Sequence, residues 1–252
     1  MLAQFDGLFW LIIILVLLVL LQRWLHREIQ AFFLILTRRQ EVTSVIFALI
    51  FLPGVFLHEL SHYIMAHLLG VRAGRFSIIP RPMPGGQLRL GYVETARGGI
   101  IKDALIGAAP LVSGCVFVAY AAIYRMEMPT LWDLLRNGQF ELFWMGVSFL
   151  PKIHDFWLWF YLTFVISSTM MPSSSDRHAW LPLGLVIGIL FGLTVLAGAG
   201  PWMLANLAPP FNSFLRGLAA IFGLSAVVHL VSVLPVALFH RVIAKVTGVD
   251  VA

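Results

Sequence analysis

Two histidines and a glutamate in this chain stand at the spacing that binds and uses a zinc ion. His58, Glu59 and His62 form the pattern H-E-x-x-H. On a helix, residues four positions apart lie one turn apart on the same face, so both imidazoles can reach one metal ion. Two imidazoles are suitable ligands for Zn²⁺, and the glutamate can take a proton from the metal-bound water. The pattern therefore predicts one zinc ion per chain, with Glu59 as the general base.

The motif lies within an apolar stretch from Ser44 to Leu69, which is long enough to cross a bilayer as a helix. Random ordering of the 8 histidines and 6 glutamates would produce the pattern only about 0.006 times per chain. Ionisable side chains inside a membrane helix are costly and usually mark a functional interior. The alternative is a chance cluster at a helix end, solvated by lipid headgroups. Spacing and surroundings together favour the metal site.

A third zinc ligand is needed, because catalytic zinc sites usually have three protein ligands and a water molecule. Asp176 is the best candidate, since it directly follows an apolar stretch and sits in a segment rich in proline and serine. Irregular backbone at membrane depth is tolerated where it lines a cavity. The alternative for Asp176 is an ordinary helix cap after a run of serines. The other candidates are weaker. His67 lies on another helix face, His154 and Asp155 are expected at the membrane interface, His178 could lie around the site, and His229 is expected in a packed interior.

The composition indicates a membrane protein, because 60% of the residues are hydrophobic and only 12% are charged. We expect an all-α polytopic fold over 1–252, a single membrane-embedded domain with about six transmembrane helices. The net charge of +5 is spread between the apolar stretches. Lipid headgroups explain such a distribution, and nucleic acid does not. The one cysteine, Cys115, excludes an intrachain disulfide.

Six apolar stretches predict the membrane spans, and they cover 8–21, 44–69, 99–124, 156–171, 181–196 and 214–239. The segments 22–39 and 126–152 are too polar to cross and are expected to lie along the membrane surface. Residues 201–210 are expected to form a loop. The chain then divides into an N-terminal helix with an interfacial segment (1–43), a central part (44–180) and two C-terminal helices (181–252).

A β-rich insertion is expected over 71–97, after the helix that carries the motif. Three prolines and a Gly-Gly pair interrupt the helical pattern there, and 75–79 and 87–94 have the alternation of short strands. Backbone groups of a small sheet must be covered by protein or lie at the membrane interface. Two roles remain open for this insertion. It is either a basic hairpin on lipid headgroups or a substrate-binding element that uses Gln87, Leu88, Arg89 and Leu90.

These features together resemble the site-2 protease family of intramembrane zinc metalloproteases, over roughly 44–180. The H-E-x-x-H motif in a membrane helix and the basic strand-forming loop after it are shared. Ala109-Pro110-Leu111-Val112-Ser113 is similar to the family's Gly-Pro-Leu-x-Asn stretch, with alanine and serine substituted. The segment from Met171 to Arg177 keeps the proline and aspartate of the family's Asn-Pro…Asp-Gly motif but lacks its asparagine and glycine. The chain thus resembles a divergent member.

The resemblance implies that His58, His62 and Asp176 bind one Zn²⁺ and that Glu59 is the general base. It implies a zinc-dependent endopeptidase that cleaves a membrane-protein or peptide substrate in or near a transmembrane segment, in the cytoplasmic membrane of a prokaryote. The substrate must unwind locally, and an edge strand within 87–94 could hold it extended by strand addition. Ser173 is expected to line a polar cleft through which water reaches the metal.

Two other classes of function compete with this hypothesis. One is a catalytically inactive membrane binding protein that keeps a structural metal site. The other is a metal or proton transporter, which needs ionisable residues spread over several spans. Most of the expected spans lack such residues.

Overall fold

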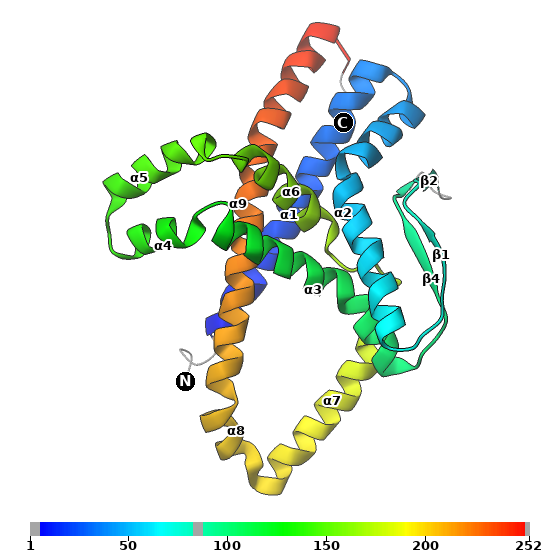
Figure 1. Ribbon diagram of the computed structural model, residues 1–252, viewed down its shortest axis with the longest axis vertical. Helices are drawn as coiled ribbons and strands as arrows, with labels where there is room; N and C mark the ends of the chain where they lie inside the picture. Colours follow the sequence, from blue (N-terminus) through cyan, green and yellow to red (C-terminus); the bar gives the residue numbers. More distant parts are fainter. Residues whose placement is uncertain (1–5, 83–87, 250–252) are drawn as a thin grey trace.

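The chain folds into a bundle of long helices with a small antiparallel β-hairpin on its side, as the computed structural model in Figure 1 shows. The structure describes residues 6–82 and 88–249. The all-α architecture with a hairpin after the motif helix is confirmed, and the long apolar helices support a multi-pass membrane protein. Within the described residues, the helical stretches long and apolar enough to cross a membrane number five, where about six were expected: Asp6–Thr37, Gln40–Leu68, Ile100–Tyr124, Trp180–Asn206 and Ala208–Thr247.

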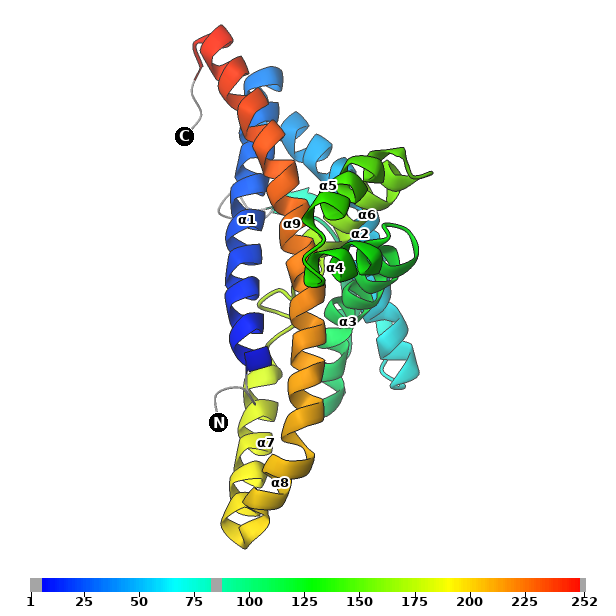
Figure 2. The ribbon, with the colours of Figure 1, turned by 90° about the vertical axis from the view of Figure 1, so that its left-hand side faces the viewer.

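Helices α1 (Asp6–Thr37) and α9 (Ala208–Thr247) run parallel and side by side (Figures 1 and 2). At one end, Arg216 forms an ion pair with Asp6 at 2.7 Å. At the other end, His240 Nδ1 lies 2.6 Å from the Glu28 carboxylate. At 1.5 Å per residue, these polar pairs are about 36 Å apart along α9, which is close to the hydrocarbon thickness of a bilayer. Between them an apolar cluster of the two helices includes Leu18, Leu21, Phe222 and Ala226.

Helix α1 does not stop at the basic residues that follow its apolar half. The expectation of a separate segment over 22–39 is wrong, because the helix continues unbroken to Thr37. Polar side chains in this second half find partners inside the protein: Gln22 donates to the Ser168 carbonyl, and Glu28 faces His240. Intramembrane polar groups commonly face the bundle interior and pair there. This half of α1 therefore stays in the bundle.

A layer of aromatic and aliphatic side chains joins α2 (Gln40–Leu68) to α6 (Phe156–Thr169). The rings of Phe47 and Phe51 have centroids 4.6 Å apart, and Phe51 lies 5.4 Å from Phe164. Aromatic rings at such distances attract each other beyond the effect of their buried area. The packing fixes α2 beside α6 and brings the motif to the end of α6.

The chain from α6 to α7 (Trp180–Thr194) follows α3 (Ile100–Tyr124) from its end to its beginning. The expectation of a fourth span over 156–171 needs correction, since α6 alone is about 21 Å long at 1.5 Å per residue and too short to cross. The expected fifth span over 181–196 lies within the long apolar stretch Trp180–Asn206. Non-helical backbone over 170–179 separates α6 from α7. Successive contacts with α3 pair Phe156 with Ala121, Met170 with Gly114, Asp176 with Gly107, and Trp180 with Ala104.

Two appendages leave this bundle. Helices α4 (Met128–Arg136) and α5 (Phe140–Phe149), with a short 3-10 turn (Leu150–Lys152), form an arm to one side (Figure 1), and neither is long enough to cross. Helix α7 continues through a π-helical turn (Val195–Ala199) into α8 (Gly200–Asn206), with no buried side chain in any of these elements. The expected loop over 201–210 is thus mostly helical.

The insertion after α2 is a hairpin in two pieces. Strand β1 (Ala73–Ser77) pairs antiparallel with β4 (Tyr92–Thr95), and β2 (Arg81–Pro82) pairs with β3 (Leu88–Arg89). The expected strand over 87–94 is therefore divided by Leu90 and Gly91, and Gln87 lies outside the described residues. The Phe76 ring lies about equally far from Phe56 and Tyr63 of α2, with centroids 6.3 Å and 6.2 Å apart. This contact docks the hairpin along the motif helix.

We expect Gly107→Ala to destabilise the chain, because a Cβ atom there would lie 1.9 Å from the Asp176 carbonyl oxygen. Overpacking of this kind costs about 1–3 kcal/mol. The matched control is Gly188→Ala in α7, where nothing lies within 4 Å of the new Cβ and helix propensity improves. Thermal unfolding in detergent, followed by circular dichroism, measures both. Equal melting temperatures would contradict the close packing of 170–179 on α3.

Candidate metal centre

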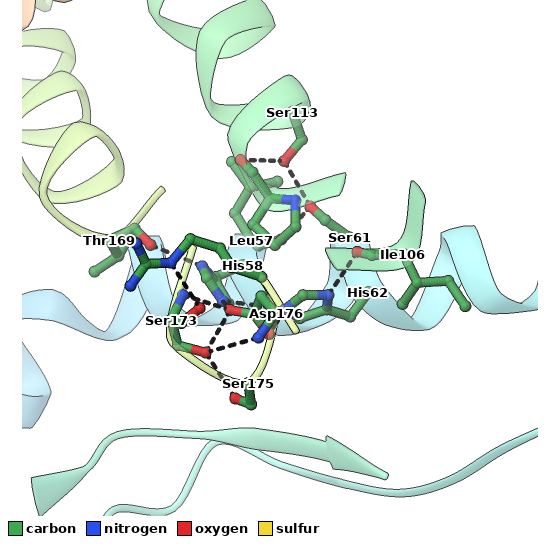
Figure 3. Close-up of polar contacts among 12 residues, drawn as sticks. Leu57, His58, Ser61, His62, Ile106, Ser113, Thr169, Ser173, Ser175 and Asp176 are labelled. Atoms are coloured by element: carbon green, nitrogen blue, oxygen red, sulfur yellow. Dashed lines mark hydrogen bonds and ion pairs between the residues drawn. The ribbon is translucent and has the colours of Figure 1, made fainter. Parts of the chain in front are cut away.

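Three donor side chains from two distant parts of the chain meet at one point (Figure 3). His58 and His62 project from α2, with their Nε2 atoms 3.2 Å apart. Asp176 comes from the non-helical segment after α6, and its Oδ1 lies 3.3 Å from His62 Nε2 while its Oδ2 lies 3.7 Å from His58 Nε2. A metal ion needs three or more ligand side chains close together. Among the described residues, His58, His62 and Asp176 form such a group.

The distances suit a tetrahedral zinc ion. Bonds of about 2.0–2.2 Å at tetrahedral angles place neighbouring ligand atoms about 3.3–3.6 Å apart. His58 Nε2 and His62 Nε2 lie 3.2 Å apart, whereas the 3.3 Å and 3.7 Å contacts with Asp176 use its two different oxygens. With one donor atom from each residue, the three atoms lie within 4.8 Å of one another. Two imidazoles and a carboxylate also form the kind of three-ligand donor set that leaves a fourth position for water. The residues present therefore fit a catalytic zinc ion.

Hydrogen bonds to backbone carbonyls fix the tautomer of both histidines. His58 Nδ1 lies 2.7 Å from the Thr169 carbonyl oxygen, and His62 Nδ1 lies 2.9 Å from that of Ile106. A carbonyl oxygen only accepts, so each Nδ1 carries the proton and donates it. In a neutral imidazole each Nε2 then keeps its lone pair. Metal-binding histidines commonly have such a partner on the other ring nitrogen.

When both histidines are neutral, electron-rich atoms are gathered without a proton between them. With both histidines neutral, two nitrogen lone pairs and a carboxylate face one another across 3.2–3.7 Å. Such an arrangement is repulsive unless a cation occupies the centre. A divalent ion bound by imidazole nitrogen and carboxylate oxygen meets this requirement.

Breaks in helical hydrogen bonding supply the two carbonyls. Pro110 lies inside α3 and has no N–H, so the carbonyl of Ile106, four residues earlier, lacks its helical donor. Thr169 is the last residue of α6, where carbonyls have no intrahelical partner. His62 and His58 provide the missing donors. This role of Pro110 was not among the expectations from the sequence, although the i−4 rule for proline was enough to find the free carbonyl.

Asp176 closes a turn with Ser173 and faces the histidines at the same time. Its Oδ2 accepts hydrogen bonds from Ser173 N at 2.7 Å and from Ser173 Oγ at 2.6 Å. These two hydrogen bonds stabilise the charged carboxylate, which is the form that binds a metal ion. The alternative of a helix cap is not borne out, because Asp176 lies in a turn and α7 begins after Ala179, which makes no side-chain cap bond. The metal-ligand role of Asp176 stays a prediction.

Glu59 is buried beside the metal group and against the hairpin. A Cβ atom added to Gly91, the residue before β4, would lie 2.9 Å from Glu59 Cγ. The backbone at the start of β4 thus covers the side chain expected to be the general base. Of the residues expected to bind substrate, Leu88 and Arg89 lie in β3, Leu90 is half-buried beside Gly91, and Ser173 is exposed.

A pair of hydroxyl groups ties the motif helix to α3. Ser61 Oγ lies 2.6 Å from Ser113 Oγ and donates to the Leu57 carbonyl at 2.5 Å. Since each hydroxyl has a single proton, Ser113 Oγ is the donor to Ser61, and it also lies 3.1 Å from the Pro110 carbonyl oxygen. The Ala-Pro-Leu-Val-Ser stretch therefore contacts the motif helix through its serine and frees a carbonyl for His62 through its proline.

The other histidines and Asp155 stand apart from the metal group. His67 Nδ1 bonds to the Tyr63 carbonyl, and His154 pairs with Asp155 at 2.8 Å on the exposed surface. His178 bonds to the Ser175 carbonyl and lies 3.7 Å from Asp103. His229 is fully buried and contacts Ser168, one residue before the carbonyl that holds His58.

Comparison with known proteins leaves the site to be interpreted from its own chemistry. No family model, curated protein or solved structure matches this chain. The arguments for its function therefore rest on the side chains, distances and hydrogen bonds described above.

Loss of a residue that only hydrogen-bonds to a metal ligand weakens metal binding by about 10–100-fold. We therefore expect Asp176→Ala, which removes a proposed ligand itself, to weaken zinc binding by at least about 100-fold. Competition between the purified protein and a coloured zinc chelator measures the affinity. The control is Asp155→Ala, because this carboxylate is half exposed and pairs with His154 instead. Unchanged affinity in Asp176→Ala would remove this residue from the metal site.

A second variant tests the role of the proline. In Pro110→Ala, the new N–H can bond to the Ile106 carbonyl and compete with His62 for it. We expect about 10-fold weaker zinc binding together with unchanged or higher thermal stability, since proline inside a helix is unfavourable. Pro235→Ala is the control, because Pro235 also lies inside a helix, in α9. The proposed competition would be contradicted if Pro110→Ala and Pro235→Ala change zinc affinity in the same proportion as they change thermal stability.

Proposed function

We propose that this chain is a zinc-dependent intramembrane endopeptidase, a divergent relative of the site-2 protease family, with its core over 44–180. The observation that carries the proposal is the convergence of His58, His62 and Asp176, with both Nδ1 atoms turned to carbonyls and both Nε2 atoms turned to one point. Five long apolar helices support a multi-pass location, which we propose is a prokaryotic cytoplasmic membrane.

The chemistry follows from the donor set. A zinc ion bound there lowers the pKa of a water molecule toward 7 and polarises the scissile carbonyl. Glu59 would act as the general base toward the attacking water and then as the general acid toward the leaving amine nitrogen. Its burial beside the ligands limits competing solvation of the carboxylate. Ser173 and Ser175, exposed next to Asp176, border the route by which water enters.

The substrate in this proposal is a transmembrane segment that has unwound locally. A peptide bond in a helix is shielded by its own hydrogen bonds, so the segment must become extended before attack. Strand β4 pairs with β1 in a two-stranded sheet, and addition of an extended peptide to this sheet as a further strand would hold the substrate. Because Gly91 precedes β4 and touches Glu59, β4 is better placed for this than β3.

We expect Glu59→Gln to abolish cleavage while zinc stays bound, because the amide cannot accept the proton. The assay uses a synthetic transmembrane peptide with a central Gly-Pro pair, mixed with the purified chain in detergent and followed by mass spectrometry. General-base catalysis contributes about 10²–10⁴-fold, so the rate should fall by at least that range. Glu141→Gln, in the α5 arm, is the control.

Two outcomes would count against the proposal. Undiminished cleavage by Glu59→Gln would exclude the mechanism. Peptide binding that is equal in wild type and Glu59→Gln, with no product from either, would favour the alternative of a binding protein with a structural metal site.

A further inference from the structure

A buried polar cluster outside the metal group connects α1, α6 and α9. It consists of Gln22 from α1, Ser168 from α6, and Ser225 and His229 from α9. Ser225 and His229 are fully buried, and Ser168 is 4% exposed. Polar groups in such an interior are unfavourable unless they are hydrogen-bonded, and in membrane spans they usually serve a function.

The cluster holds the last turn of α6. The Ile166 carbonyl still has a backbone donor, Met170 N, at 2.9 Å. The next carbonyls toward the helix end lack helical donors, and two of them are satisfied from opposite sides. The Ser168 carbonyl accepts from Gln22 Nε2, while the Thr169 carbonyl accepts from His58 Nδ1. Adjacent carbonyls thus join the cluster to a proposed metal ligand.

The proton positions in the cluster can be assigned. His229 Nδ1 lies 2.7 Å from the Ser225 carbonyl and must donate to it. Its Nε2, 2.8 Å from Ser168 Oγ, is then the acceptor, and the serine hydroxyl donates. Ser168 is therefore fixed at its hydroxyl by α9 and at its carbonyl by α1. Because peptide groups are planar, fixing the Ser168 carbonyl also fixes the Thr169 nitrogen, and the Thr169 carbonyl can then move only through the φ and ψ of that one residue.

We propose that Gln22 and His229 are positioning residues for the metal ligand His58. They act through Ser168 and Thr169, since neither touches the metal group. By fixing the end of α6, they hold the carbonyl that keeps the His58 proton on Nδ1 and its Nε2 lone pair toward His62 and Asp176. The inference rests on the proposed function and extends the metal site to two helices outside the H-E-x-x-H helix and α3.

The test compares Gln22→Leu and His229→Leu with wild type, using the full chain in detergent. Zinc affinity is measured by chelator competition, and the geometry of the site by the visible spectrum of the Co²⁺-loaded protein. We expect about 10-fold weaker zinc binding and an altered cobalt spectrum in both variants. His229→Gln, which keeps a hydrogen-bonding group, should recover part of the loss. The control is Ser232→Ala in α9, whose hydroxyl bonds only within its own helix, to the Val228 carbonyl at 2.7 Å.

A metal-free readout separates this inference from the proposed function. Nitrogen NMR of the histidine side chains reports the tautomer of His58 without any ion. We expect Nδ1–H alone in wild type and a mixture of tautomers in Gln22→Leu. The positioning role would be overturned if Gln22→Leu and His229→Leu lose thermal stability but keep the zinc affinity, cobalt spectrum and His58 tautomer of the Ser232→Ala control. If wild type binds no zinc but the His58 tautomer still changes in Gln22→Leu, the positioning role stands and the proposed function is overturned.

Discussion

A carbonyl group left without a donor inside a membrane protein must find one, and this requirement organises the centre of the molecule. Pro110 frees the Ile106 carbonyl within α3, and the end of α6 frees the carbonyl of Thr169. The imidazoles of His62 and His58 donate to these two groups. Each histidine thereby turns its other nitrogen inward, toward Asp176. The same hydrogen bonds complete the helices and prepare two lone pairs for a cation.

Close packing on α3 allows this arrangement. Gly107 and Gly114 are seven residues apart on that helix, and the non-helical chain after α6 lies directly on both. Small residues at helix interfaces permit such approach of one backbone to another. Irregular backbone in a membrane protein is tolerated where protein covers it, and here it delivers Asp176. The interruption between α6 and α7 is therefore part of the site.

Much of this structure could be predicted from the sequence. Apolar length gave the long helices, and four-residue spacing put His58 and His62 on one face. Asp176 stood out through its position after an apolar stretch. What could not be predicted depends on partners far along the chain: Glu28 meets His240 and Gln22 meets Ser168, so α1 continues through residues that look interfacial. Periodicity also cannot show that α6 and α7 follow one path along α3, because each is apolar on all sides.

The parallel pairing of α1 and α9 has a consequence for how the molecule is made. Their contacts join residues more than 200 positions apart, such as Gly7 with Asn212, so this interface has the longest sequence separation among the described hydrogen bonds. A chain emerges from synthesis N-terminus first, and α1 must wait for its partner until about 200 further residues have been produced. His229 is made with α9. The Ser168 hydroxyl at the end of α6 therefore gains its partner only after α9 has been made, and a truncation before α9 leaves this helix end with its contacts to α1 and α2.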